Sequence, residues 1–128
     1  MAIDPAEREE INRHSEYGWL ILKDNPRLAM AADIAYCHHE KWDGTGYPRR
    51  LAGDAIPLSA RIVQLADIYD ALRSARPYKP AFTHEHAVRI LTVGDYRIRP
   101  ERDFDPALTA VFARHHLEFE KIWARLVD

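Results

Sequence analysis

Residues 57–76 read PLSARIVQLADIYDALRSAR and carry a two-sided helical pattern. At about 100° per residue, Asp67, Asp70 and Ser74 fall within one narrow sector of such a helix. The apolar stripe on the other side comprises Ile62, Leu65, Tyr69 and Leu72. Proline cannot continue a helix, so Pro77 ends this one. The stretch therefore predicts a long amphipathic helix with one face in a protein core.

Four further helices follow from capping residues and prolines. A capping side chain stands directly before proline in Asp4-Pro5, Asn25-Pro26 and Asp105-Pro106, and Thr83 caps another helix. These predicted helices span residues 5–22, 26–40, 83–93 and 105–126. The predicted loops cover residues 41–56, 77–82 and 95–104. Because no stretch alternates at period two for long enough to form a strand, the predicted fold is an all-α bundle of about five helices.

The composition indicates one ordinary soluble domain. Of the 128 residues, 47% are hydrophobic and 30% are charged. The lone cysteine, Cys37, cannot form an internal disulfide, so we expect a cytoplasmic protein. Because Cys37 ends the apolar stretch Ala31–Cys37, we expect its thiol to be buried. No apolar run approaches the roughly 18 residues of a membrane span. The net charge of −2 argues against general nucleic-acid binding, whereas the six bases and three acids of residues 49–79 suit a small phosphorylated ligand.

Residues 38–48, HHEKWDGTGYP, carry the strongest chemical signal of the chain. His38 and His39 supply two adjacent imidazoles, which are neutral nitrogen ligands for a divalent metal. Glu40 follows at once, and a glycine-containing turn leads to Tyr47. A purely structural segment has little use for paired histidines beside such a turn. The pattern therefore favours a metal site that faces a polar substrate.

The end of helix 57–76 offers a second chemical signal, with two interpretations. Asp67 is followed by Arg73, Arg76 and Lys79, an order expected of a metal ligand beside a phosphate clamp. The alternative is an ordinary amphipathic helix whose acids face water and whose terminal bases offset the helix dipole. The local pattern favours neither interpretation.

Short motifs follow one another in order from the histidine pair onward. They are His38-His39-Glu40, Asp43-Gly44, Gly46-Tyr47-Pro48, Leu51, Gly53, Ile56-Pro57, Ala60-Arg61-Ile62, Ala66-Asp67, Asp70-Ala71-Leu72 and Arg76-Pro77-Tyr78-Lys79. Taken together, they resemble the HD-GYP family, a branch of the HD metal-dependent phosphohydrolases that degrades the bacterial second messenger cyclic di-GMP. The resemblance spans about residues 5–112, with Phe104-Asp105-Pro106 as a further mark. It implies a single helical HD-type domain over residues 1–128.

The resemblance also implies roles for individual residues. The implied metal ligands are His14, His38, His39 and Asp67. The implied substrate-binding residues are Gly46, Tyr47, Arg76 and Lys79, and Asp70 is a further catalytic candidate. In the family, the complete site holds two or three divalent ions, chiefly iron or manganese, and cleaves a phosphodiester of cyclic di-GMP or a related nucleotide. The Gly-Tyr-Pro loop is also implicated in docking diguanylate cyclase domains.

One motif of the family is missing. No His-Asp dipeptide occurs in this chain, although the family takes its name from that pair, whose aspartate bridges the metals. In the family the pair precedes the helix that matches residues 5–22, so we expect an N-terminally truncated domain that holds one ion or none. The leading hypothesis is an incomplete cyclic di-GMP phosphodiesterase domain. The alternative is a catalytically inactive HD-GYP module that binds proteins or ligands in second-messenger signalling.

Two smaller departures concern arginines. Arg50 stands where the family usually has glycine, so we expect a different backbone conformation in that turn. Arg73 stands where a small hydroxylated residue is common, and we expect it to add charge beside the phosphate site.

His84 and His86 lie at a helix start and are interpreted as surface residues, whereas His115 and His116 are interpreted as surface or packing residues. His116 and Glu120 do have the i,i+4 spacing of a helical metal site, but nothing around them resembles a substrate loop. Without the family's preceding helices, apolar surface from Leu20, Ile21 and Ile34 should remain open. Such surface promotes self-association, so we expect a homo-oligomer.

Overall fold

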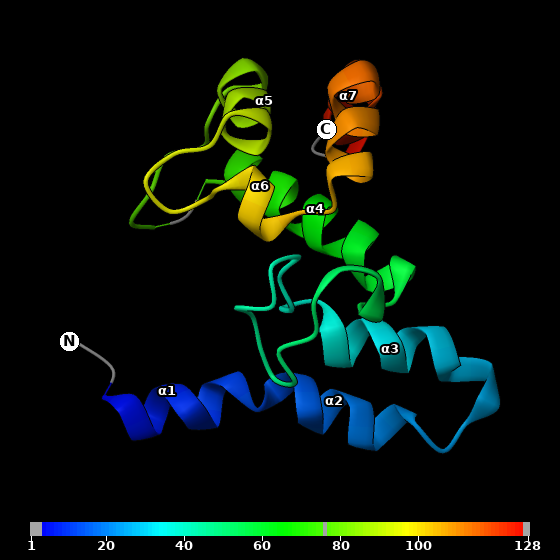
Figure 1. Ribbon diagram of the computed structural model, residues 1–128. Helices are drawn as coiled ribbons and strands as arrows, with labels where there is room; N and C mark the ends of the chain where they lie inside the picture. The colour runs from blue at the N-terminus through cyan, green and yellow to red at the C-terminus, as the bar shows by residue number, and fades with distance from the viewer. Residues whose placement is uncertain (1–3, 76, 127–128) are drawn as a thin grey trace. The chain divides into compact units, whose positions relative to one another are not determined.

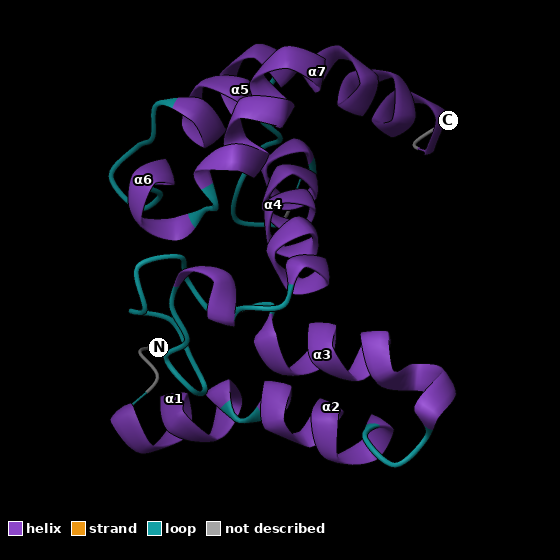
Figure 2. Cartoon of the chain, turned by 45° about the vertical axis from the view of Figure 1, so that its right-hand side comes forward, coloured by secondary structure: helices purple, strands orange, loops and turns teal. Residues whose placement is uncertain are grey.

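The computed structural model describes residues 4–75 and 77–126. The chain divides into two compact units, Met1–Gln64 and Leu65–Asp128, and the division falls within helix α4 (Leu58–Arg73). The described residues form helices, turns and loops without a β-strand (Figure 2), which confirms the predicted all-α class. None of the described helices is long and apolar enough to cross a membrane.

The first unit is built on a helical hairpin. Its helices are α1 (Pro5–Asn12), α2 (His14–Leu22) and α3 (Ala29–Cys37), with 3-10 turns η1 (Pro26–Leu28) and η2 (Gly53–Ala55). Helices α2 and α3 run antiparallel along each other (Figure 1). Gly18 permits their close approach, because a Cβ atom there would lie 3.1 Å from the Cβ of Ala35. The hairpin brings the end of α3 beside the start of α2.

A small core ties the long loop after α3 to this hairpin. Its buried residues are Cys37, Ile56 and Ala60, and the half-buried Tyr36 and Leu51 pack against them. Burial raises the pKa of the Cys37 thiol, as expected for a structural rather than a reactive cysteine. The predicted buried thiol is confirmed.

The second unit has its own, larger core. It contains the C-terminal half of α4 together with α5 (His84–Thr92), α6 (Pro100–Asp103) and α7 (Pro106–Leu126). The buried core residues are Leu65, Tyr69, Leu72, Ala87, Ile90, Leu91, Phe104 and Phe112. Three of these belong to the apolar stripe predicted on α4. The fourth member, Ile62, is instead 48% exposed, because it lies on the α4 turn before Leu65, outside this core.

The predicted capping residues are confirmed by hydrogen bonds. The Asp4 carboxylate accepts the backbone N–H of Glu7 at 2.7 Å. The side chains of Asn25, Thr83 and Asp105 likewise accept a backbone N–H group from the first turn of their helices. The donors are Arg27, His86 and Ala107, respectively. Each side chain satisfies a donor that the first helical turn leaves without an intrahelical partner.

The helix boundaries depart from prediction at several places. The helix predicted over residues 57–76 ends at Arg73, before the predicted end. The predicted helix 5–22 is interrupted at Arg13, whose N–H is shared between the carbonyls of Glu9 and Glu10. The predicted helix 26–40 ends as an α-helix at Cys37, because the His38 ring occupies the carbonyls of its last turn. The short helix α6 lies in a segment predicted as loop.

Candidate metal centre

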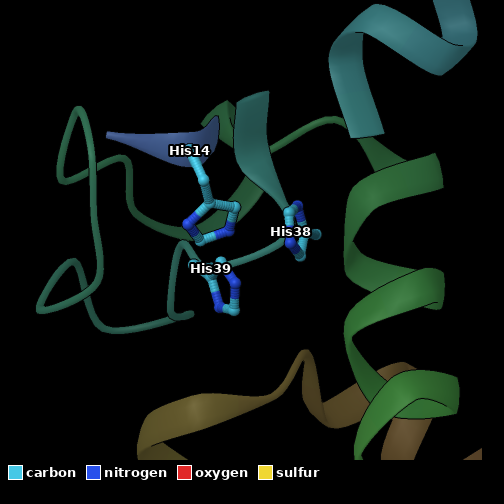
Figure 3. Close-up of side chains that lie close together, drawn as sticks. All are labelled: His14, His38 and His39. Atoms are coloured by element: carbon cyan, nitrogen blue, oxygen red, sulfur yellow. The ribbon is translucent and has the colours of Figure 1, made fainter. Parts of the chain in front are cut away.

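Three histidine rings gather in the first unit where α2 begins and α3 ends (Figure 3). His14 is the first residue of α2, and His38 and His39 directly follow α3. One ligand nitrogen from each ring lies within 4.8 Å of the others. The ring centroids are 4.0 Å apart for His38 and His39, and 4.8 Å apart for His14 and His39. The spacing suits one divalent ion held by three imidazoles.

The hydrogen bonds of His38 determine which of its nitrogens is available. Its Nδ1 lies 2.9 Å from the carbonyl oxygen of Ile34 and 3.2 Å from that of Ala35. Carbonyl oxygens only accept hydrogen bonds, so Nδ1 must carry the proton. The neutral ring therefore presents a bare Nε2, and the same bond fixes its orientation, as is usual for metal-ligating histidines.

His39 is held in its neutral form by its surroundings. Burial, together with the nearby His38 and His14 rings, lowers the pKa of His39 to about 4. One face of the ring stacks on Tyr47, with centroids 4.9 Å apart and planes 17° apart. A neutral imidazole is the form that binds a metal, so His39 needs no deprotonation at neutral pH.

Glu40 organises the loop that carries Tyr47. Its side chain is 1% exposed, and its two carboxyl oxygens accept the backbone N–H groups of Arg49 and Leu51, each at 2.8 Å. Its carbonyl oxygen accepts a hydrogen bond from the Gln64 side chain at 2.7 Å. Glu40, the third residue of the histidine motif, thus holds in place the part of the loop that follows Tyr47.

Gly46 is required for the same loop to close. A Cβ atom at this position would lie 2.4 Å from the carbonyl oxygen of His39 and 2.5 Å from the backbone nitrogen of Lys41. The next residue, Tyr47, donates its N–H to the His39 carbonyl at 3.2 Å. The close approach that this glycine permits is therefore to the chain's own backbone, which positions Tyr47 against His39.

Arg50 adopts a conformation that favours glycine. Its φ angle is 55°, in the left-handed region that costs a side-chain-bearing residue about 1–2 kcal/mol. The expected difference between this turn and that of the family stays a prediction. The turn has the positive φ for which glycine is suited, and the arginine bears the strain.

The other predicted site residues belong to the second unit. Asp67 and Asp70 are exposed on α4. Lys79 is half-buried, and its Nζ atom donates to the carbonyl of Pro80 at 3.2 Å and lies 4.3 Å from the Phe82 ring centroid. Arg76 lies outside the described residues. The metal and substrate roles of these side chains stay predictions.

A buried polar network in the second unit was missed by sequence analysis. His84, interpreted as a surface residue, is 6% exposed. Its Nδ1 lies 2.9 Å from the Tyr69 hydroxyl, and its Nε2 lies 2.9 Å from Nδ1 of His116. Burial lowers the pKa of His84. The surface interpretation of His84 is therefore wrong, and the packing interpretation of His116 is confirmed.

Arg73 belongs to this network rather than to a phosphate site. It is 8% exposed, donates to the Tyr69 hydroxyl at 2.8 Å and to the Glu120 carboxylate, and lies 4.2 Å from the Trp123 ring centroid. The expectation that Arg73 adds charge for an anion is wrong. The sequence did contain a signal for this burial. Arg73 lies four residues after Tyr69, a residue of the apolar stripe, and residues with this spacing share a helix face.

The comparison with protein families matches the HD domain over residues 2–106. The chain belongs to the HD-domain family. Among the relatives of this HD domain, a "Cyclic di-GMP phosphodiesterase" of Vibrio cholerae serotype O1 is 52% identical over 101 residues, covering 79% of this chain and 20% of the relative. A "3'3'-cGAMP-specific phosphodiesterase 2" of the same organism is 42% identical over 128 residues, covering 98% of this chain and 24% of the relative.

A third relative is the "Cyclic di-GMP phosphodiesterase response regulator RpfG" of Xanthomonas campestris pv. campestris. It is 42% identical over 118 residues, covering 91% of this chain and 30% of the relative. These matches confirm that the HD domain lies in the HD-GYP branch recognised from its motifs. The chain spans between a fifth and a third of the length of these relatives.

Proposed function

We propose that this chain is part of a metal-dependent phosphodiesterase that hydrolyses cyclic di-GMP. The observation that carries the proposal is the cluster of His14, His38 and His39, whose ligand nitrogens converge within 4.8 Å. Membership of the HD-domain family and the activities for which the relatives are named support the same reaction. The donor set fits the metal, because imidazole nitrogens suit iron and other first-row transition ions.

The three histidines would hold one ion, and Asp67 is the proposed carboxylate ligand to the metal centre. A divalent metal supplies Lewis acidity toward the phosphodiester. The protein's own contribution is orientation: the bonds of His38 to its helix and the stacking of His39 on Tyr47 fix two of the rings. We propose iron or manganese as the native ion and a centre of more than one ion in the complete protein.

Substrate binding is assigned to a further set of residues. Lys79 and Arg76 would hold the phosphates, the former as a point charge and the latter as a planar fork. Asp70 is proposed to orient a substrate hydroxyl or a ligand, and Gly46 and Tyr47 would form the wall of the site. Three relatives are named as 3'3'-cGAMP-specific phosphodiesterases, so that dinucleotide is the second substrate to compare.

A non-catalytic role is the second candidate. No His-Asp dipeptide occurs within the 128 residues, and a protein without that pair would lack the bridging carboxylate implied by the family resemblance. In that case the Gly-Tyr-Pro loop would serve as an interaction surface for diguanylate cyclase domains.

Hydrolysis of cyclic di-GMP tests the two candidates. The chain is reconstituted anaerobically with iron or manganese, and cyclic di-GMP and 3'3'-cGAMP are supplied separately. We expect turnover that is lost in His39→Ala and retained in His115→Ala, a matched change at an exposed histidine of α7. Absence of turnover in a folded, metal-loaded chain would favour the non-catalytic role.

A further inference from the structure

A cavity of about 310 Å³ lies in the second unit, and none of its described lining residues belongs to the histidine cluster. It is bounded by the C-terminal half of α4, by the segment before α5 and by the segment after it, and these two segments run side by side (Figure 1). Its lining residues are Ile68, Ala71, Leu72, Tyr78, Lys79, Arg97 and Ile98. Only Lys79 among them was assigned a function from the sequence.

The polar part of this cavity is cationic. Lys79 and Arg97 come from segments 18 residues apart, and none of the described lining residues is acidic. The neighbouring carboxylate, that of Asp95, accepts the backbone N–H groups of Arg97 and Ile98 at 2.8 and 2.7 Å. The Arg97 guanidinium also lies 5.1 Å from the Tyr96 ring centroid. Because two basic residues line one cavity, a bound anion would be favoured there.

The rest of the cavity is apolar and aromatic. Four aliphatic residues form its floor: Ile68, Ala71, Leu72 and Ile98. Tyr78 stands at the rim, 83% exposed, with its ring free to stack on a planar group. A simple inorganic anion has no use for such a floor or rim. A phosphorylated ligand with an aromatic ring system matches both parts of the cavity.

We propose that this cavity is a nucleotide-binding subsite, in which Lys79 and Arg97 bind a phosphate and Tyr78 stacks on the base. The inference rests on the proposed function for its ligand class, and it adds Arg97 and Tyr78 as specificity-determining residues. Arginine can fork onto two phosphate oxygens, whereas lysine offers a point charge. The cavity volume is in the range of small-molecule sites.

Binding of GMP, measured by calorimetry at low ionic strength with EDTA present, tests the proposal. The chelator removes any contribution from a metal at the histidine cluster. We expect GMP to bind, and guanosine and inorganic phosphate to bind more weakly, because each engages only part of the cavity. Arg97→Ala should weaken GMP binding about tenfold or more, as expected for a lost charge-assisted hydrogen bond.

Two variants serve as controls for this measurement. Arg99→Ala removes the same charge from an exposed residue two positions along, and His39→Ala disables the metal cluster; neither should change GMP binding. Arg97→Ala retains the backbone hydrogen bonds of Arg97 to Asp95 and Arg102, so the fold should persist. Inorganic phosphate binding as tightly as GMP, absence of GMP binding, or equal losses in Arg97→Ala and Arg99→Ala would overturn the proposal.

The failure of this subsite is distinguishable from failure of the proposed function. Metal-dependent hydrolysis without EDTA-resistant GMP binding would overturn the subsite alone. GMP binding that depends on Arg97, without hydrolysis, would leave the subsite standing and overturn the catalytic role.

Discussion

Glu40 has a structural role that its place in the histidine motif does not reveal. Both of its carboxyl oxygens are used to hold backbone N–H groups of the loop, and the side chain is almost fully buried. If an amide nitrogen replaced one of these oxygens, its N–H groups would face a backbone N–H group of the loop, and two donors cannot form a hydrogen bond. We therefore expect Glu40→Gln to lower the free energy of unfolding by about 1–3 kcal/mol.

Urea unfolding measures this effect. The matched control is Glu85→Gln, at an exposed position in the first turn of α5, which should change stability by less than about 0.5 kcal/mol. Equal stability of the Glu40 and Glu85 variants would contradict the anchoring role of Glu40.

Arg50 supplies a prediction of the opposite sign. Because its φ angle is positive, Arg50→Gly should relieve backbone strain and stabilise the chain by roughly 1 kcal/mol, less the added entropy of the unfolded glycine. Arg50→Ala separates strain from charge, since alanine removes the guanidinium and keeps the Cβ atom. In thermal unfolding, the Arg50→Gly variant should have a higher melting temperature than both the native chain and Arg50→Ala. The lowest melting temperature for Arg50→Gly would contradict the proposed backbone strain.

At the level of elements, a hydrogen bond between two imidazoles links α5 to α7. The bond between Nε2 of His84 and Nδ1 of His116 needs one proton between the two nitrogens. A second proton would make both nitrogens donors and break the link. Among the ionisable groups that face His84, Arg73 and His116 oppose its protonation, whereas Glu120 and Glu85 favour it.

This arrangement predicts acid-sensitive stability. The folded pKa of His84 lies below the 6.5 of an ordinary histidine, so the unfolded chain binds more protons as the pH falls below that value. Stability from this group is thus complete above about pH 6.5 and is lost toward lower pH. The Arg73 hydrogen bond lowers the pKa of Glu120, which adds a loss of the same sign below pH 4.5.

Unfolding midpoints at pH 7.5 and 5.5 test this prediction. The unfolding midpoint should decrease less from pH 7.5 to pH 5.5 in His84→Gln than in the native chain. In His86→Gln, at an exposed position of the same helix, the decrease should equal that of the native chain. The pKa of the half-buried His39 is also lowered, so its contribution has the same sign. The informative quantity is therefore the difference between the His84 and His86 variants. An identical decrease in both would show that His84 does not contribute.

The element boundaries separate what local sequence can and cannot predict. Caps are local, so Asp4, Asn25, Thr83 and Asp105 were recognised from neighbouring residues alone. The backbone at His115 has a φ of −120° within α7, and no proline or glycine marks that kink. Such features depend on packing between segments that are distant in the sequence.

At the scale of the whole molecule, the histidine cluster was predictable because it follows a family motif, whereas the His84 network was not. His84, His116 and Arg73 are separated along the sequence, and only tertiary packing brings their side chains together. The homo-oligomer remains a prediction. Ile21 and Leu20 are 81% and 45% exposed, in agreement with the expected open apolar surface, and Ile34 is half-buried.

Metal content is the measurement that tests the central claim most directly. The chain is dialysed anaerobically against excess iron or manganese, then against metal-free buffer, and bound metal per chain is determined by elemental analysis. We predict at least one equivalent in the native chain and in His115→Ala, and a loss of about one equivalent in His39→Ala. Equal metal content in all three would contradict a centre formed by His14, His38 and His39.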